Sequence, residues 1–245
     1  MRYAVVADIH GNIEAFQAVI AHAHQNGGFD AILCLGDVVG YGPNPHQCLE
    51  LLRAHIHVCV PGNHDLAAAG SIDTSGFNPQ AAAATEWTSR QLTDDDRTYL
   101  MDLPELQALA DITLVHGSPR SPPWEYITSS REASENLSFF ETSYCLVGHT
   151  HVPLVYRCRL GEEDCVAEEL LPGIELHLSE DRMIINPGGV GQPRDGIPAA
   201  AYALLNTDGH WLRSFRVEYP IARTQEKMLQ AGLPSSLIRR LSYGL

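Results

Sequence analysis

Residues 146–153 read LVGHTHVP, an apolar run that stops at Gly148 and is followed by His149 and His151. The same change from apolar to polar occurs where four other apolar runs end, at these residues: Asp8 and His10; Asp37; Asn63 and His64; His116. In α/β proteins, the loops that carry function collect at the carboxyl ends of the strands. The repeated pattern therefore predicts strands that deliver polar side chains to one place.

Strands and helices are expected to alternate in the first half of the chain, and strands to dominate the second. Apolar or alternating runs predict strands at 3–7, 31–35, 56–60, 112–115, 144–147, 154–159, 175–178, 183–186, 201–205 and 211–219. Helical spacing predicts helices at 13–25, 45–54, 78–100, 131–140, 221–230 and 235–241, with Thr93 as an N-cap inside the third. We expect one two-sheet α/β domain over 1–245, with a helical cover at about 66–103 and C-terminal helices at 221–241.

The charge of the chain limits its partners. Sixteen basic residues against 30 acidic ones give a formal net charge of -14, which disfavours binding to nucleic acid or to an anionic membrane. An anionic small-molecule substrate would need a local positive charge. Lys227 is the only lysine, so the chain has no P-loop Gly-Lys pair, and a Schiff-base enzyme is disfavoured. The sequence leaves the oligomeric state open, a homo-oligomer included.

Compartment and cysteine chemistry follow from two further features. The N-terminal residues MRYAVVADIHGN turn acidic within eight positions, unlike a signal peptide, and no apolar run reaches 18 residues. We therefore expect a soluble, cytoplasmic protein. The cysteines contain no C-x-x-C pair, and three lie inside apolar runs, which favours six buried, reduced thiols: Cys34, Cys48, Cys59, Cys145, Cys158 and Cys165.

Eight polar groups at five strand ends are hard to explain by capping alone. Burying such groups without partners costs roughly 2 to 7 kcal/mol each, whereas a metal site satisfies them together. Residues one apart on an extended chain point to the same side, so Asp8 with His10, and His149 with His151, are expected to face one pocket. Histidines outside these strand ends are interpreted as structural or solvated: His22, His24, His46, His55, His57, His177 and His210.

Seven side chains are candidate ligands, too many for one ion with an open coordination position: Asp8, His10, Asp37, Asn63, His116, His149 and His151. Two ions about 3.5 to 4 Å apart, bridged by a carboxylate, fit this number better. Oxygen and imidazole donors without cysteine favour Mn, Fe, Zn, Ni or Co, and we take Mn as the first expectation. Such a site is net positive, which suits a phosphate ester, and lowers the pKa of bound water so that hydroxide becomes the nucleophile.

His64 is the eighth group and remains outside the ligand count. An imidazole beside the ions suits a donor to a phosphate oxygen or a general acid for the leaving alkoxide, so His64 is the candidate catalytic residue. Trp124 and Tyr126 follow His116 in a loop rich in proline and serine. They either stack on a nucleoside or aryl leaving group or pack as a lid.

Five motifs in order resemble the calcineurin-like metallophosphoesterases: DIHGN at 8–12, GD at 36–37, GNHD at 62–65, HG at 116–117 and GHTH at 148–151. NPGGVGQPR at 186–194 resembles a later motif of the small bacterial and archaeal phosphodiesterase-like branch. The resemblance implies an αββα four-layer sandwich of two packed mixed sheets flanked by helices. It also implies that Asp8, His10 and His151 hold one ion. Asn63, His116 and His149 would hold the other, with Asp37 bridging the two and His64 facing the scissile phosphate.

One motif departs from part of the family. The protein Ser/Thr phosphatase branch reads GDxxDRG, whereas residues 36–42 here read GDVVGYG, without the carboxylate that would orient His64 and without the arginine that grips phosphate. Asn12, Tyr41 and Arg194 are candidate replacements for phosphate binding. Arg194 could equally hold the loop at 187–194 against the sheet. Asp65 could orient His64 or cap the following helix.

The sequence therefore predicts a dinuclear-metal-dependent phosphoesterase that hydrolyses phosphomono- or phosphodiester bonds by attack of a metal-bridging hydroxide. Three alternatives stay open: a phosphoprotein (Ser/Thr) phosphatase, a dinucleoside-polyphosphate phosphatase, and a scaffold that keeps the fold without catalysis. Intact ligand positions and an intact His64 argue against the scaffold.

Overall fold

The computed structural model describes residues 1–159, 161–162 and 164–245. One sheet contains β1 (Arg2–Val6), β2 (Ala31–Cys34), β3 (His57–Cys59), β9 (Glu175–His177), β11 (Ala200–Asn206) and β12 (Trp211–Val217). The other contains β4 (Leu106–Leu109), β5 (Ile112–Val115), β6 (Tyr144–Leu146), β7 (Leu154–Cys158), β8 (Val166–Glu169) and β10 (Arg182–Asn186). The helices are α1 (Ile13–Gln25), α2 (Pro45–Arg53), α3 (Asn63–Ala69), α4 (Pro79–Gln91), α5 (Asp94–Met101), α6 (Ser130–Asn136), the 3-10 turn η1 (Leu137–Phe139), α7 (Ile221–Gln230) and α8 (Ser235–Arg240).

Both sheets are mixed, and each contains a group of three neighbouring parallel strands. The first has the order β3-β2-β1-β11-β12-β9, in which β1, β2 and β3 are parallel and the remaining pairs are antiparallel. The second has the order β4-β5-β6-β10-β7-β8, in which β5, β6 and β10 are parallel. The carboxyl ends of the two parallel groups lead into the loops that carry the candidate site.

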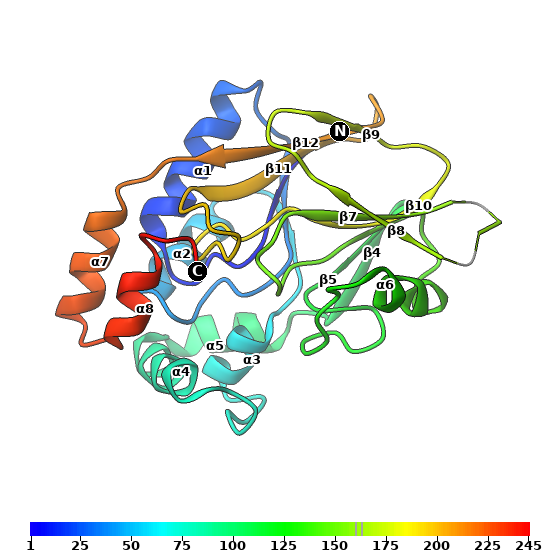
Figure 1. Cartoon of the computed structure of the whole chain (residues 1–245). Helices are drawn as coiled ribbons and strands as arrows, with labels where there is room; N and C mark the ends of the chain where they lie inside the picture. Colours follow the sequence, from blue (N-terminus) through cyan, green and yellow to red (C-terminus); the bar gives the residue numbers. More distant parts are fainter. Residues whose placement is uncertain (160, 163) are drawn as a thin grey trace.

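Side-chain alternation on the central strands creates the layers. On β1, Ala4 and Val6 face the core beneath α1, whereas Tyr3 and Val5 face the second sheet. A third core, which includes Cys145, lies on the outer face of the second sheet beneath α6. Figure 1 shows α1 and α2 on one outer side of the paired sheets and α6 on the other. The predicted αββα arrangement is confirmed.

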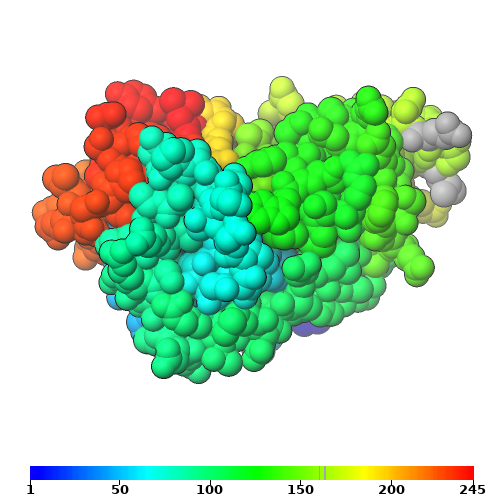
Figure 2. Space-filling model, turned by 90° about the horizontal axis from the view of Figure 1, so that it is seen from below, coloured from blue at the N-terminus to red at the C-terminus, as the bar shows by residue number. Residues whose placement is uncertain are grey.

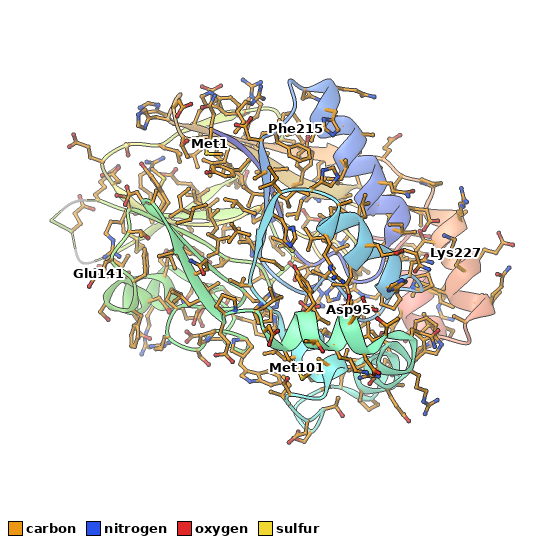
Figure 3. All side chains as sticks on the ribbon, turned by 180° about the vertical axis from the view of Figure 1, so that it is seen from behind. Met1, Asp95, Met101, Glu141, Phe215 and Lys227 are labelled. Carbon is orange, nitrogen blue, oxygen red and sulfur yellow. A yellow bond between two sulfur atoms is a disulfide. The ribbon has the colours of Figure 1, made fainter. Side chains whose placement is uncertain are left out.

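The helical cover and the C-terminal helices close over one end of the molecule. Thr93 accepts a hydrogen bond from the backbone of Asp96 and caps α5, as its position predicted. Lys227 lies on α7 (Figure 3). Its ammonium donates to the buried carboxylate of Glu14 on α1 and, at 3.2 Å, to Asn44. The one lysine of the chain therefore links the C-terminal helix α7 to the first helix, α1. Among the residues that the structure describes, no helix combines the length and apolar character needed to cross a bilayer.

The expectation of six reduced thiols is wrong for two of them. Cys158 and Cys165 form a disulfide, whereas Cys34, Cys48, Cys59 and Cys145 are free and buried. The antiparallel register of β7 and β8 pairs Arg157 with Val166. Cys158 follows Arg157 and Cys165 precedes Val166, so the two cysteines lie side by side. This pairing depends on a strand, β8, whose exposed residues VAEE gave no strand pattern in the sequence.

Cysteine labelling tests this pairing. Protein unfolded in denaturant without a reductant should take up iodoacetamide at four cysteines, because the disulfide protects Cys158 and Cys165. After reduction, all six should react, and intact mass spectrometry counts the added groups. Six labels without a reductant would contradict the disulfide.

Candidate metal centre

The candidate ligands come from both sheets and meet where the parallel strands end. Asp8 and His10 follow β1, Asp37 follows β2, and Asn63 begins α3 after β3. His116 directly follows β5 in the second sheet, and His149 and His151 lie in the loop after β6. All seven side chains are buried, the most exposed being Asn63 at 6%. The structure thus gathers six of the seven residues that the sequence singled out into neighbouring clusters and places Asn63 beside His149 on the wall of one cavity.

The backbone at this junction is left-handed at an unusual number of positions. In the described part of the chain, eight non-glycine residues have positive φ, and six of them surround the site: Asp8, His10, Asp37, Tyr41, His149 and His151. The chain is therefore not extended there, so the premise of the expectation is wrong, although Asp8 and His10 do face one cluster. Such conformations cost on the order of 1 to 3 kcal/mol each and cluster at functional sites.

The ligand atoms form two clusters that share one carboxylate. Asp8, His10, Asp37 and His151 make the first cluster, and Asp37, His116 and His149 make the second; within each, the candidate atoms lie within 4.8 Å of one another. Asp37 Oδ2 is 3.5 Å from His10 Nε2 and 3.4 Å from His116 Nε2. Asp37 thus lies between the clusters. A Cβ on Gly62 would lie 2.0 Å from Asp37 Oδ1, so only glycine fits there.

The imidazoles of the first cluster have their tautomers fixed by backbone carbonyls. His10 Nδ1 faces Val39 O at 3.1 Å, and His151 Nδ1 faces Gln192 O at 2.5 Å. Since a carbonyl oxygen only accepts, each Nδ1 carries the proton and each Nε2 presents a lone pair. The two Nε2 atoms nevertheless face each other at 3.3 Å. Two lone pairs at this distance need a cation between them.

The second cluster repeats this arrangement. His116 Nδ1 donates to Leu35 O at 2.7 Å and His149 Nε2 donates to Trp124 O at 3.2 Å. The remaining nitrogens, His116 Nε2 and His149 Nδ1, are 3.0 Å apart. Carbonyl partners of this kind orient metal-binding histidines and fix their tautomers.

Two oxygen atoms complete the fit to a metal pair. Asp8 Oδ2 and Asn63 Oδ1 are buried and accept no hydrogen bond from the described residues. Leaving a buried acceptor unpaired costs about 1 to 3 kcal/mol. Asp8 belongs to the first cluster, and Asn63 lines the cavity that His149 of the second cluster also lines. The donor set of carboxylate, amide oxygen and imidazole suits divalent transition ions, so the residues present fit a dinuclear centre.

The clustered charges shift the pKa values of the site strongly. Burial alone would raise the pKa of Asp37, but the imidazoles of His116 and His64 hold it well below its usual value. Burial alone would lower the pKa of His116, but the Asp37 carboxylate raises it to about 9. In the chain alone, a proton on His116 therefore balances Asp37. A divalent ion must displace that proton to bind.

His64 lies next to the clusters, and it is oriented by Asp37 and Thr85 rather than by Asp65. Its backbone N–H donates to Asp37 Oδ1 at 2.9 Å, and its Nδ1 is 3.3 Å from the Thr85 hydroxyl. Burial lowers the pKa of His64 to about 4. Asp65 instead accepts from the backbone N–H groups of Gly62, at 3.0 Å, and Val39, at 2.9 Å, so it caps α3. Thr85, on α4, had no recognisable pattern in the sequence.

The candidate phosphate-binding residues have different environments. Asn12 caps α1: Oδ1 accepts from Ala15 N and Thr224 Oγ1, while Nδ2 donates to Gly191 O. Its amide is thus engaged mainly in the fold. Tyr41 is buried, with its ring 4.3 Å from that of His64 and 4.7 Å from that of His10, centroid to centroid.

Arg194 places a positive charge beside the site. Its guanidinium donates to Gln192 Oε1 at 3.1 and 3.3 Å, which leaves the charge without a carboxylate in these contacts. Burial is the main cause of the pKa shifts of six residues at the site, and the positive charge of Arg194 also acts on each of these pKa values. The six are Asp8, His10, Tyr41, His64, His149 and His151. Burial and the like charge of Arg194 lower the pKa of Arg240, on α8. Arg240 was missed because its place depends on how the C-terminal helices dock.

Comparisons with known proteins agree with this geometry. The sequence profile of the calcineurin-like phosphoesterase family matches residues 1–172. An uncharacterized protein of Methanocaldococcus jannaschii is 36% identical over 98% of this chain and 97% of its own length. The crystal structure of a metallophosphoesterase from Sphaerobacter thermophilus superposes with a TM-score of 0.90 at 45% identity, covering 100% of this chain and 99% of that one.

A partial match extends to an enzyme of stated activity. A symmetrical bis(5'-nucleosyl)-tetraphosphatase of Ectopseudomonas mendocina is 30% identical over 55% of this chain and 51% of its own length. The family profile covers more than half of the chain. The archaeal relative matches in sequence along nearly the whole chain, and the Sphaerobacter structure matches in fold along all of it. The chain belongs to the calcineurin-like phosphoesterase family.

Proposed function

We propose that the protein is a dinuclear-metal-dependent hydrolase of small-molecule phosphomono- or phosphodiesters. The observation that carries this proposal is the pair of buried clusters joined at Asp37, together with the facing nitrogens of His10 and His151 and the unpaired buried oxygens of Asp8 and Asn63. Family membership supports a hydrolase that acts on phosphoesters. Two divalent ions, with Mn the first choice, would supply positive charge for phosphate and a water of lowered pKa.

Each side chain has a definite task in this proposal. Asp8, His10 and His151 would hold one ion, Asn63, His116 and His149 would hold the other, and Asp37 would be shared by both. The carbonyls of Val39, Gln192, Leu35 and Trp124 keep the four imidazoles in the tautomer that leaves a lone pair for metal. Because these partners are backbone atoms, the orientation of the ligands is built into the loops themselves.

His64 is the proposed hydrogen-bond donor to the substrate. If the Thr85 hydroxyl donates to Nδ1, the proton of the neutral ring lies on Nε2, free for a phosphate oxygen or for the leaving alkoxide. The hydrogen bond from the backbone N–H of His64 to Asp37 Oδ1 keeps the imidazole beside the clusters.

Arg194 and Arg240 are the proposed anchors for the non-reacting oxygens of the phosphate. The family's protein-phosphatase arginine is replaced by Tyr41, so a positive charge must come from elsewhere. Arg194 follows the loop that packs on Asp8, since Gly191 N donates to Asp8 O at 2.9 Å. Tyr41 lies close enough to both guanidiniums for their charges to act on its pKa, which burial raises.

Hydrolysis of dinucleoside polyphosphates is the second candidate function. The partial likeness to a symmetrical bis(5'-nucleosyl)-tetraphosphatase favours it, whereas the Gly40-Tyr41 pair in place of Asp-Arg disfavours it. A panel of an aryl phosphodiester, a phosphopeptide and diadenosine tetraphosphate separates this candidate and the protein phosphatase from the leading proposal.

Metal binding should raise thermal stability through Asp37. Protein stripped with a chelator and then given Mn²⁺ at about 100 times the dissociation constant gains about 2.7 kcal/mol. For a chain of this size, Tm should rise by about 5 to 10 °C. Differential scanning calorimetry measures the shift, which Asp37→Asn should abolish and the exposed Asp102→Asn should keep. An equal shift in Asp37→Asn would contradict a shared ligand.

Two substitutions should separate metal binding from proton donation. Asp37→Asn should abolish hydrolysis of bis(p-nitrophenyl) phosphate together with metal content. His64→Ala should keep the metal but lower kcat by about 10²- to 10⁴-fold, as expected for loss of a positioned acid or donor. The exposed His177→Ala is the control. Wild-type kcat in His64→Ala would remove His64 from the mechanism and leave the metal site standing.

A further inference from the structure

An open cavity of about 130 Å³ lies beside the second cluster. Its inner border is formed by Asn63, His64 and His149, which belong to the site described above. Four aromatic side chains form much of the remaining wall: Tyr41, Phe77, Trp124 and Tyr126. The candidate ligands Asn63 and His149 therefore line a cavity whose wall is largely aromatic.

The aromatic wall is continuous from the ligands outward. The ring of Tyr126 stacks on that of His149, with centroids 3.8 Å apart. Phe77 lies 4.7 Å from His64 and 5.9 Å from Trp124, in the second case edge to face. Trp124 is 41% exposed and Tyr126 45% exposed, so neither packs as a closed lid. Figure 2 shows the helical cover around residue 75 against the segment after His116.

The loop that carries these two rings is held in place from behind. Glu125, between Trp124 and Tyr126, is largely buried and accepts hydrogen bonds from Ser118, Arg120 and Asn136. This pairing with Arg120 is the main cause that lowers the pKa of Glu125 to about 2. The Trp124 carbonyl accepts the hydrogen bond of His149. The exposed rings are thus preorganised and joined directly to a candidate ligand.

We infer that this cavity binds a flat aromatic ring of the substrate, an aryl group or a nucleobase, and that Trp124 and Tyr126 select for it. An engineered cavity of about 150 Å³ binds benzene, so the space suits one ring system. Aromatic walls gain most from stacking a flat ring, and an aliphatic ester group gains less. The inference rests on the proposed function, since the ring is placed by a phosphate held at the two clusters.

Binding of non-hydrolysable ligands tests the inference without relying on turnover. Titration calorimetry of the Mn²⁺-loaded protein would compare phenylphosphonate, a nucleoside phosphonate and methylphosphonate. We expect the aromatic ligands to bind at least about tenfold more tightly than methylphosphonate, and Trp124→Ala to remove most of that difference. The tighter of the two aromatic ligands identifies aryl or nucleobase as the natural group.

Controls keep the outcomes distinct. Tyr126→Phe should retain the preference because its ring still stacks on His149, and Phe139→Ala, an exposed aromatic change outside the cavity, should match the wild type. Equal affinity for phenyl- and methylphosphonate in a protein that hydrolyses phosphoesters would overturn the inference alone. A metal-loaded protein that neither binds these ligands nor hydrolyses any ester would overturn the proposed function, and the inference with it.

Discussion

The structure depends on the burial of carboxylates and imidazoles at the junction of two sheets. The lone pairs of His10 and His151, which face each other across 3.3 Å, repel unless positive charge lies between them. The surrounding chain accepts left-handed backbone at six non-glycine positions to achieve this arrangement. Gly62 is needed where the backbone approaches Asp37. The local strain is maintained by the apolar cores on both sides of the sheets.

The division of the site between the sheets couples function to packing. Asp8 and Asp37 belong to the first sheet, and His116 and His149 to the second. The core between the sheets, which includes Val5, Leu33 and Leu114, sets their separation. A substitution in that core is therefore expected to change the ligand distances as well as stability.

Much of the fold and of the candidate site was predictable because polar, metal-binding types of side chain follow the ends of the buried strands. The apolar runs before Asp8, Asp37 and His149 mark buried parallel strands, and their polar ends mark the site. The strands β4 and β8 were missed because their residues LQAL and VAEE are exposed or only partly buried and form sheet edges. Thr85 and Arg240 reach the site through helix docking, and the disulfide follows from strand register. None of these long-range relations leaves a local pattern.

One contact has a practical meaning for handling the protein. Lys227 carries the only side-chain amine of the chain, and that amine faces Glu14 and Asn44. Acylating reagents therefore find one lysine to modify, and reaction there would strip the charge that holds α7 to α1. Immobilisation or cross-linking is better directed at carboxylates, which the acidic surface supplies in excess.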